Sequence, residues 1–127
     1  MPTCLMFDDM PVILKIGERL LTQAGYEVTT VGTIDEVARH IETNGCADLM
    51  ILSGTGSATG IGELIRSVRD RLGGKRPVIL VSVIDRAIGP LMRYRRAGAN
   101  GILLKPFDAD GFRDTIAVHT RSAELAA

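Results

Sequence analysis

An apolar run at residues 49–52, Leu-Met-Ile-Leu, ends at Ser53 and is followed by a glycine-rich loop at residues 54–60, with the sequence GTGSATG. The run is apolar at every position, which is typical of a strand buried on both faces of a parallel sheet. Because ligands and chemistry gather at the carboxyl ends of parallel strands, Ser53 is expected at the functional edge of the sheet.

Four further segments have the composition of strands, at residues 3–7, 26–31, 77–82 and 101–104. Stretches with apolar residues at helical spacing separate the strands, and another follows the last strand. The first helix is expected to begin at Pro11, whose missing N–H costs nothing there, and to stop at Gly25. Its buried face is expected to carry Ile13, Ile16, Leu20, Leu21 and Ala24.

Local signals place the ends of other helices. Thr33 and Glu36 form a capping box, in which each side chain satisfies a free backbone N–H. Pro90 cannot lie deep inside a helix, so the fourth helix is expected to begin just before it and to end at Gly98. Residues 122–127 are expected to fray.

Five strands alternating with five helices predict a parallel sheet covered by helices on both faces. In 127 residues this pattern predicts a single α/β domain spanning residues 1–127. We expect a flavodoxin-like three-layer (βα)5 sandwich, with a five-stranded parallel sheet in the order 2-1-3-4-5. A closed barrel would need about eight such units.

Composition narrows the classes of function. The formal net charge is zero, so no electrostatic footprint for nucleic acid or an anionic membrane is expected. Cys4 and Cys46 lack metal-ligand spacing and are expected to be free thiols in a reducing compartment. With no signal peptide and no apolar run near ~20 residues, the protein is expected to be soluble and cytoplasmic.

Polar residues end or directly follow the first, fourth and fifth strands. Asp8 and Asp9 follow the first strand, Ser82 ends the fourth, and Lys105 follows the fifth. In this order and spacing, the chain resembles the receiver domain of bacterial two-component response regulators, of the chemotaxis-regulator kind. The resemblance covers nearly the whole chain, including the strand at residues 48–52.

The resemblance implies roles for these residues. Asp8 and Asp9 look like the family's metal-binding acidic pair, and Ser82 looks like its switch hydroxyl. Lys105 looks like the lysine that contacts the phosphoryl group, before a Lys-Pro bond that is typically cis. The family is a signalling family rather than an enzyme family. The implied partner is a protein, either a histidine kinase or a downstream signalling protein.

Three features depart from the family's pattern. Ser53 stands at the position of the phosphoacceptor Asp, the loop at 54–60 lacks the usual Met-Pro-Gly pattern, and Ile102 replaces the aromatic switch residue. These departures predict a stand-alone pseudo-receiver that acts by protein–protein contact without phosphorylation. We expect a monomer or a weak homodimer.

The missing carboxylate also bears on metal binding, because Mg²⁺ prefers hard oxygen ligands in octahedral geometry. We expect Mg²⁺ binding at Asp8 and Asp9 to be weak or lost, with Lys105 ion-paired to them. Helix capping is the alternative role for the acidic pair, and a hydrogen bond to backbone is the alternative for Ser82. A phosphorylatable regulator that uses Ser53 or another acceptor, with Asp8 or Asp9 as base, remains the alternative function.

Two further features leave alternatives open. Arg93, Arg95 and Arg96 flank Tyr94 on the fourth helix, where they form a solvated face, an anionic second-messenger site or, with Ile102, a partner face. In receivers, the surface made by the fourth helix, fifth strand and fifth helix commonly docks partners. The glycine-rich loop resembles a phosphate cradle, so nucleotide or flavin binding is a second alternative function.

Overall fold

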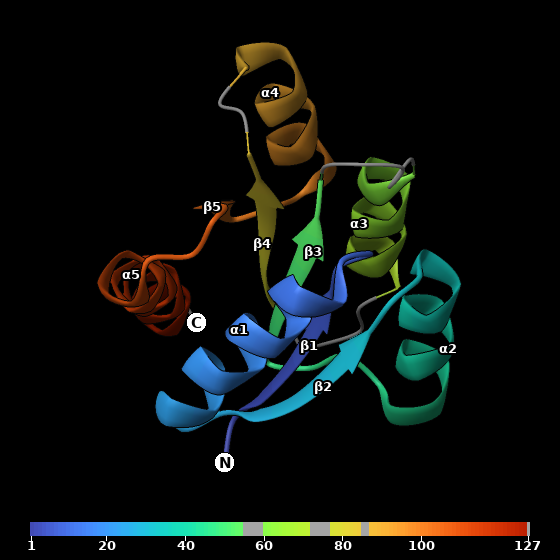
Figure 1. Cartoon of the computed structure of the whole chain (residues 1–127). Helices are drawn as coiled ribbons and strands as arrows, with labels where there is room; N and C mark the ends of the chain where they lie inside the picture. The colour runs from blue at the N-terminus through green and yellow to red at the C-terminus, as the bar shows by residue number, and fades with distance from the viewer. Residues whose placement is uncertain (55–59, 72–76, 85–86, 127) are drawn as a thin grey trace.

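The structure is a computed structural model that describes residues 1–54, 60–71, 77–84 and 87–126 (Figure 1). Within these residues, strands and helices alternate along the chain. The strands are β1 (Thr3–Phe7), β2 (Glu27–Val31), β3 (Leu49–Ser53), β4 (Val78–Val83) and β5 (Gly101–Leu104). The helices are α1 (Pro11–Gln23), α2 (Ile34–Asn44), α3 (Ile61–Asp70), α4 (Ile88–Ala97) and α5 (Ala109–Ala126).

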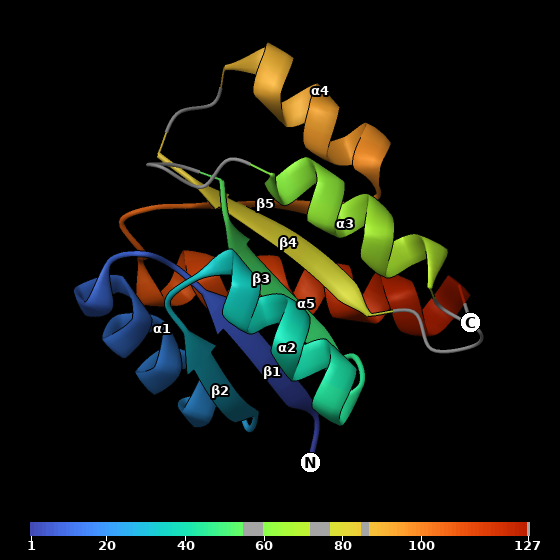
Figure 2. The ribbon, with the colours of Figure 1, turned by 90° about the vertical axis from the view of Figure 1, so that its right-hand side faces the viewer.

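The five strands form one parallel sheet in the order β2-β1-β3-β4-β5, as the sequence predicts. Helices α1 and α5 cover one face, and α2, α3 and α4 cover the other (Figure 2). Each face has its own apolar core, because alternate residues of a strand point to opposite sides. In β3, Met50 and Leu52 pack on the α3 side, whereas Leu49 and Ile51 pack on the α1 side.

The buried face of α1 differs from the predicted one. Ile16 is 41% exposed and Ala24 is exposed, whereas Gly17 is buried. A Cβ atom at Gly17 would collide with the end of the Met6 side chain in β1. The glycine therefore lets α1 approach the sheet closely, and the helix turns Ile16 outward.

The predicted helix boundaries are mostly confirmed. The Thr33 hydroxyl accepts a hydrogen bond from the Glu36 N–H at 3.1 Å and donates one to the Glu36 carboxylate. Helix α4 begins two residues before Pro90 and ends at Gly98, whose φ is 123°. Helix α5 continues to Ala126, and the expected fraying of residues 122–127 stays a prediction.

Arg69 of α3 forms hydrogen bonds with the segments that lead into β4 and β5. Its Nε donates to the Gly98 carbonyl at 2.9 Å, and Nη1 donates to the Pro77 carbonyl at 2.7 Å. Its Nη2 donates at 2.7 Å to Asn100 Oδ1, which also accepts from the Ile79 N–H. One guanidinium thus holds the chain before β4 and the connection between α4 and β5.

Replacing Arg69 by Ala is expected to lower the free energy of unfolding by about 2–3 kcal/mol, because hydrogen bonds to a charged donor are lost and their acceptors lose a partner. Urea unfolding followed by circular dichroism measures the change. Arg66→Ala, at an exposed position on the same helix, is the matched control and should stay within about 0.5 kcal/mol of wild type. Equal effects of the two substitutions would contradict this role of Arg69.

Candidate functional site

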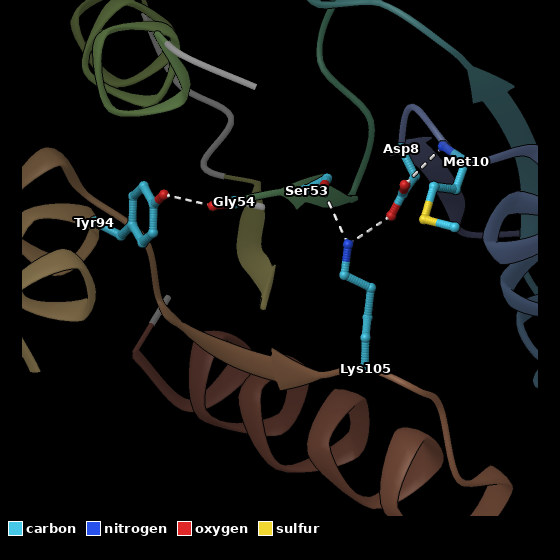
Figure 3. Close-up of polar contacts among 6 residues, drawn as sticks. All are labelled: Asp8, Met10, Ser53, Gly54, Tyr94 and Lys105. Atoms are coloured by element: carbon cyan, nitrogen blue, oxygen red, sulfur yellow. Dashed lines mark hydrogen bonds and ion pairs between the residues drawn. The ribbon is translucent and has the colours of Figure 1, made fainter. Parts of the chain in front are cut away.

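Three of the predicted site residues meet at the carboxyl edge of the sheet. Asp8 follows β1, Ser53 ends β3 and Lys105 follows β5. The Lys105 ammonium donates to Asp8 Oδ2 at 2.9 Å and to Ser53 Oγ at 3.0 Å (Figure 3). All three side chains are buried, at 0%, 0% and 7% exposure. The parallel topology produces this meeting, since all five strands end at the same edge.

Asp8 has two roles, one for each of its oxygens. Oδ2 forms the ion pair with Lys105, and Oδ1 accepts from the Met10 N–H at 2.9 Å. Met10 is the N-cap residue, directly before the first residue of α1. The Asp8 carboxylate therefore both caps the start of α1 and pairs with Lys105. The neighbouring Asp9 is exposed.

Ser82 lies beside Ser53 in the register of β4 and β3. Its side chain is fully buried, and its Oγ has no hydrogen-bond partner within the described part of the chain. The hydrogen bond to backbone that we considered for Ser82 is therefore not present there. A buried hydroxyl without a partner costs about 1–3 kcal/mol.

Tyr94 contacts the chain directly after Ser53, a contact that the sequence analysis missed. The Tyr94 hydroxyl donates to the Gly54 carbonyl at 3.0 Å (Figure 3). A Cβ at Gly54 would lie 2.7 Å from Val81 Cγ1 and 2.9 Å from the Tyr94 oxygen, so only glycine fits. Tyr94 is half-buried and packs with Ile102 against the core.

The other residues of the predicted partner face point in different directions. Arg93 and Arg96 line a groove between α4 and α3. Arg95 instead donates from Nη1 to the Asn100 carbonyl at 3.2 Å, on the side of β5. A helix places residues three and four apart on one side, so Arg95 shares its side with Ile88 and Met92. These two apolar side chains are 72% and 48% exposed.

The glycine-rich loop is described only at its two ends. Gly54 lies at the end of β3, and Gly60, with a φ of 90°, begins α3. Residues 55–59, which carry the predicted phosphate cradle, lie outside the described residues.

Cys4 and Cys46 are free cysteines, as the sequence predicts. Burial raises the pKa of the Cys4 thiol, which favours its neutral and unreactive form. On α5, burial lowers the pKa of His119, and the nearby Arg95 cation lowers it further. Neither Cys4 nor His119 belongs to the cluster at the sheet edge.

The sheet order and the polar residues at its carboxyl edge define a receiver-type α/β domain. The sequence profile of the response regulator receiver domain matches residues 4–117. The chain therefore belongs to the response regulator receiver domain family of two-component signalling, whose members are generally non-enzymatic and interact with histidine kinases or downstream effector proteins.

Solved structures agree with this family. The signal receiver domain of a response regulator from Bermanella marisrubri is 25% identical, with a TM-score of 0.80, over 92% of this chain and 96% of that one. The Vibrio cholerae chemotaxis protein CheY4 is 24% identical, with a TM-score of 0.84, over 94% and 98% of the two chains. A CheY-like receiver domain protein from Methanospirillum hungatei JF-1 is 21% identical, with a TM-score of 0.85, over 100% and 99%. No curated protein sequence matches the chain.

Receiver domains typically bind Mg²⁺ in the phosphorylation site. The described residues fit the ion poorly, since both oxygens of Asp8 already have partners and Ser53 brings a neutral hydroxyl. Across the described ranges, no group of three or more His, Cys, Asp or Glu side chains could hold a metal ion. No helix in that part of the chain is long and apolar enough to cross a bilayer.

Proposed function

We propose that this receiver domain acts by protein–protein contact, without phosphorylation at residue 53. The observation that carries the proposal is the Lys105 ammonium held between Asp8 and Ser53. In the family, this lysine contacts the phosphoryl group. Here it is engaged by two buried side chains, which favours one fixed arrangement of the site.

The chemistry at Ser53 supports the same proposal. A serine hydroxyl becomes a nucleophile only when a neighbouring base takes its proton. The Lys105 ammonium contacts Ser53 Oγ, and an ammonium group is a donor with no acceptor capacity. Asp8, the carboxylate bound to the same ammonium, is held by Lys105 and Met10. Ser53 is therefore a poor phosphoacceptor.

Weak Mg²⁺ binding is part of the proposal. Asp8 and Asp9 are the carboxylates of the site, and the Lys105 ammonium offsets one of their two charges, which leaves a net charge of −1. Displacing the lysine from Asp8 would leave an ammonium buried without its partner, which is costly. Mg²⁺ would therefore compete with an ion pair that already exists.

The proposed partner is a histidine kinase or a downstream signalling protein. The receiver domain would bind it as a monomer or a weak homodimer. The outer side of α4 suits such a contact. Ile88 and Met92 are exposed apolar side chains in line with Arg95, and Leu104 of β5 is 36% exposed. Apolar residues together with arginine are typical of the energetically important part of protein interfaces.

Incubation with acetyl phosphate and Mg²⁺ is expected to leave the mass of the protein unchanged, because the Lys105 ammonium donates a hydrogen bond to Ser53 Oγ and takes no proton from it. Beryllofluoride with Mg²⁺ is expected to leave its near-ultraviolet circular dichroism unchanged, because residue 53 offers a neutral hydroxyl rather than a carboxylate oxygen to hold it. Intact-mass spectrometry is the primary measurement. A mass gain of one phosphoryl group, located at Ser53 by peptide mapping, would overturn the proposal.

A specific observation favours a second function, a response regulator phosphorylated at Ser53 or another acceptor. The Ser82 hydroxyl is buried beside Ser53 and has no partner among the described residues. A phosphoryl group on Ser53 would supply an acceptor for that hydroxyl. The same mass measurement decides between the two functions.

A further inference from the structure

A basic groove lies between α3 and α4, apart from the sheet edge. The two helices lie side by side (Figure 1, Figure 2). The groove has a volume of about 520 Å³ and is open to solvent. Arg66 of α3 faces Arg93 and Arg96 of α4 across it, and Tyr94 and Glu63 also line it.

The groove concentrates positive charge in a chain whose formal net charge is zero. Three guanidinium groups and one carboxylate give it a net charge of +2 (three minus one). Arg66, Arg93 and Arg96 are exposed, and none has an ion pair or hydrogen bond to another described residue. Three like charges with a single carboxylate among them repel one another, and an anionic ligand would relieve that repulsion.

The first turn of α3 adds to this potential. Gly60 begins the helix without a side-chain cap, and Gly62 has open space where a Cβ would lie. Both residues line the groove. The first N–H groups of a helix favour negative charge, and the first turn of α3 lines the same groove as the three arginines.

We propose that this groove binds a phosphorylated small molecule that carries at least two negative charges. Guanidinium groups match phosphate oxygens through paired hydrogen bonds, and a ligand with two or more negative charges would engage more than one of the three arginines. The volume lies within the range of small-molecule sites and suits a nucleotide-sized ligand. The site does not rest on the proposed loss of phosphorylation, because its residues are not those that hold Lys105.

Tyr94 connects the groove to the sheet edge. One side of this residue lines the groove, and its hydroxyl donates to the carbonyl of Gly54, next to Ser53. A ligand in the groove therefore lies against the side chain that holds the end of β3 to α4.

The test is isothermal titration calorimetry of the whole chain with pyrophosphate, GDP and a cyclic dinucleotide, and with uncharged guanosine for comparison. At least one phosphorylated probe is expected to bind, and guanosine is not. The double variant Arg93→Ala, Arg96→Ala should weaken that binding by about tenfold or more. Arg95→Ala, on the same helix but outside the groove, is the matched control and should keep wild-type affinity.

Glu63→Gln provides a second readout, because it removes the one carboxylate of the groove and is expected to tighten binding several-fold. All these residues are exposed, and circular dichroism verifies that each variant folds. Ser53→Asp should leave the groove affinity unchanged, which separates this site from the phosphorylation chemistry.

Three results would overturn the proposal. The first is that none of the phosphorylated probes binds at millimolar concentration. The second is that Arg95→Ala weakens binding as much as the double variant does. The third is that a Glu-rich peptide binds at Arg93 and Arg96 while the phosphorylated probes do not, which would assign the groove to a protein partner.

Discussion

Replacing Lys105 by Met is expected to lower the free energy of unfolding by about 3–5 kcal/mol, one of the largest effects available in this chain. The substitution keeps much of the side-chain volume but removes the ammonium. The Asp8 carboxylate, fully buried, would then keep the Met10 N–H as its remaining contact. Small domains have about 5–15 kcal/mol of stability in total, so the loss amounts to about a fifth of that stability or more. Urea unfolding monitored by circular dichroism gives the value.

Two variants make this result interpretable. Lys15→Met changes an exposed lysine on α1 and should alter stability by about 0.5 kcal/mol or less. The double variant Asp8→Asn, Lys105→Met removes both charges and should recover part of the loss, since the cost comes from an uncompensated buried charge. If Lys105→Met alone lowers the free energy of unfolding by less than about 1 kcal/mol, water reaches Asp8 and the ion pair does not stabilise the fold.

The meeting of Asp8, Ser53 and Lys105 could be predicted from the sequence because it depends on topology. Apolar runs fixed where each strand ends, and a parallel sheet brings those ends to one edge. The ion pair between Lys105 and the acidic pair was likewise expected, and it forms with Asp8. Which of the two acids would be buried was not predictable, because this depends on how the chain turns between β1 and α1.

The direction of side chains on α4 was harder to predict. Arg93, Tyr94, Arg95 and Arg96 look like one exposed polar run, yet Tyr94 turns inward to Gly54. The signal was present in the spacing, since Leu91, Tyr94 and Ala97 recur every three residues and place one side of the helix on the core. Arg69 gave no such signal. Its three acceptors belong to segments that only the tertiary fold brings together.

Glycines explain both a missed contact and a wrong prediction. Periodicity is read from apolar side chains, so a glycine in a helix counts as a gap rather than as part of the buried face. At Gly17 the gap is the place of closest approach to β1, and the buried face of α1 centres there instead of at Ile16. At Gly54 the missing side chain makes room for the Tyr94 ring. Backbone proximity of this kind follows from packing, which sequence periodicity does not report.

Ser53→Asp is expected to raise the affinity for Mg²⁺ by about tenfold or more, because a second charged oxygen ligand would stand beside Asp8. The single positive charge of Lys105 would then offset only one of two buried carboxylates and leave the other negative charge for the metal. The same variant is expected to gain a phosphoryl group from acetyl phosphate, since a carboxylate needs no base to act as a nucleophile. Calorimetry measures the first effect and intact-mass spectrometry the second.

Ser53→Asn is the matched control, because asparagine has the same shape as aspartate but no charge. It should leave Mg²⁺ binding as weak as in the wild type. The two readouts locate the cause of any failure. If Ser53→Asp binds Mg²⁺ tightly but gains no phosphoryl group, the changes in the loop at residues 54–60 and at Ile102 block the chemistry on their own. If it binds no more Mg²⁺ than Ser53→Asn does, the ion pair between Asp8 and Lys105 excludes the metal even when a new carboxylate is present. That result would contradict the charge argument and make Lys105, rather than Ser53, the residue that prevents Mg²⁺ binding.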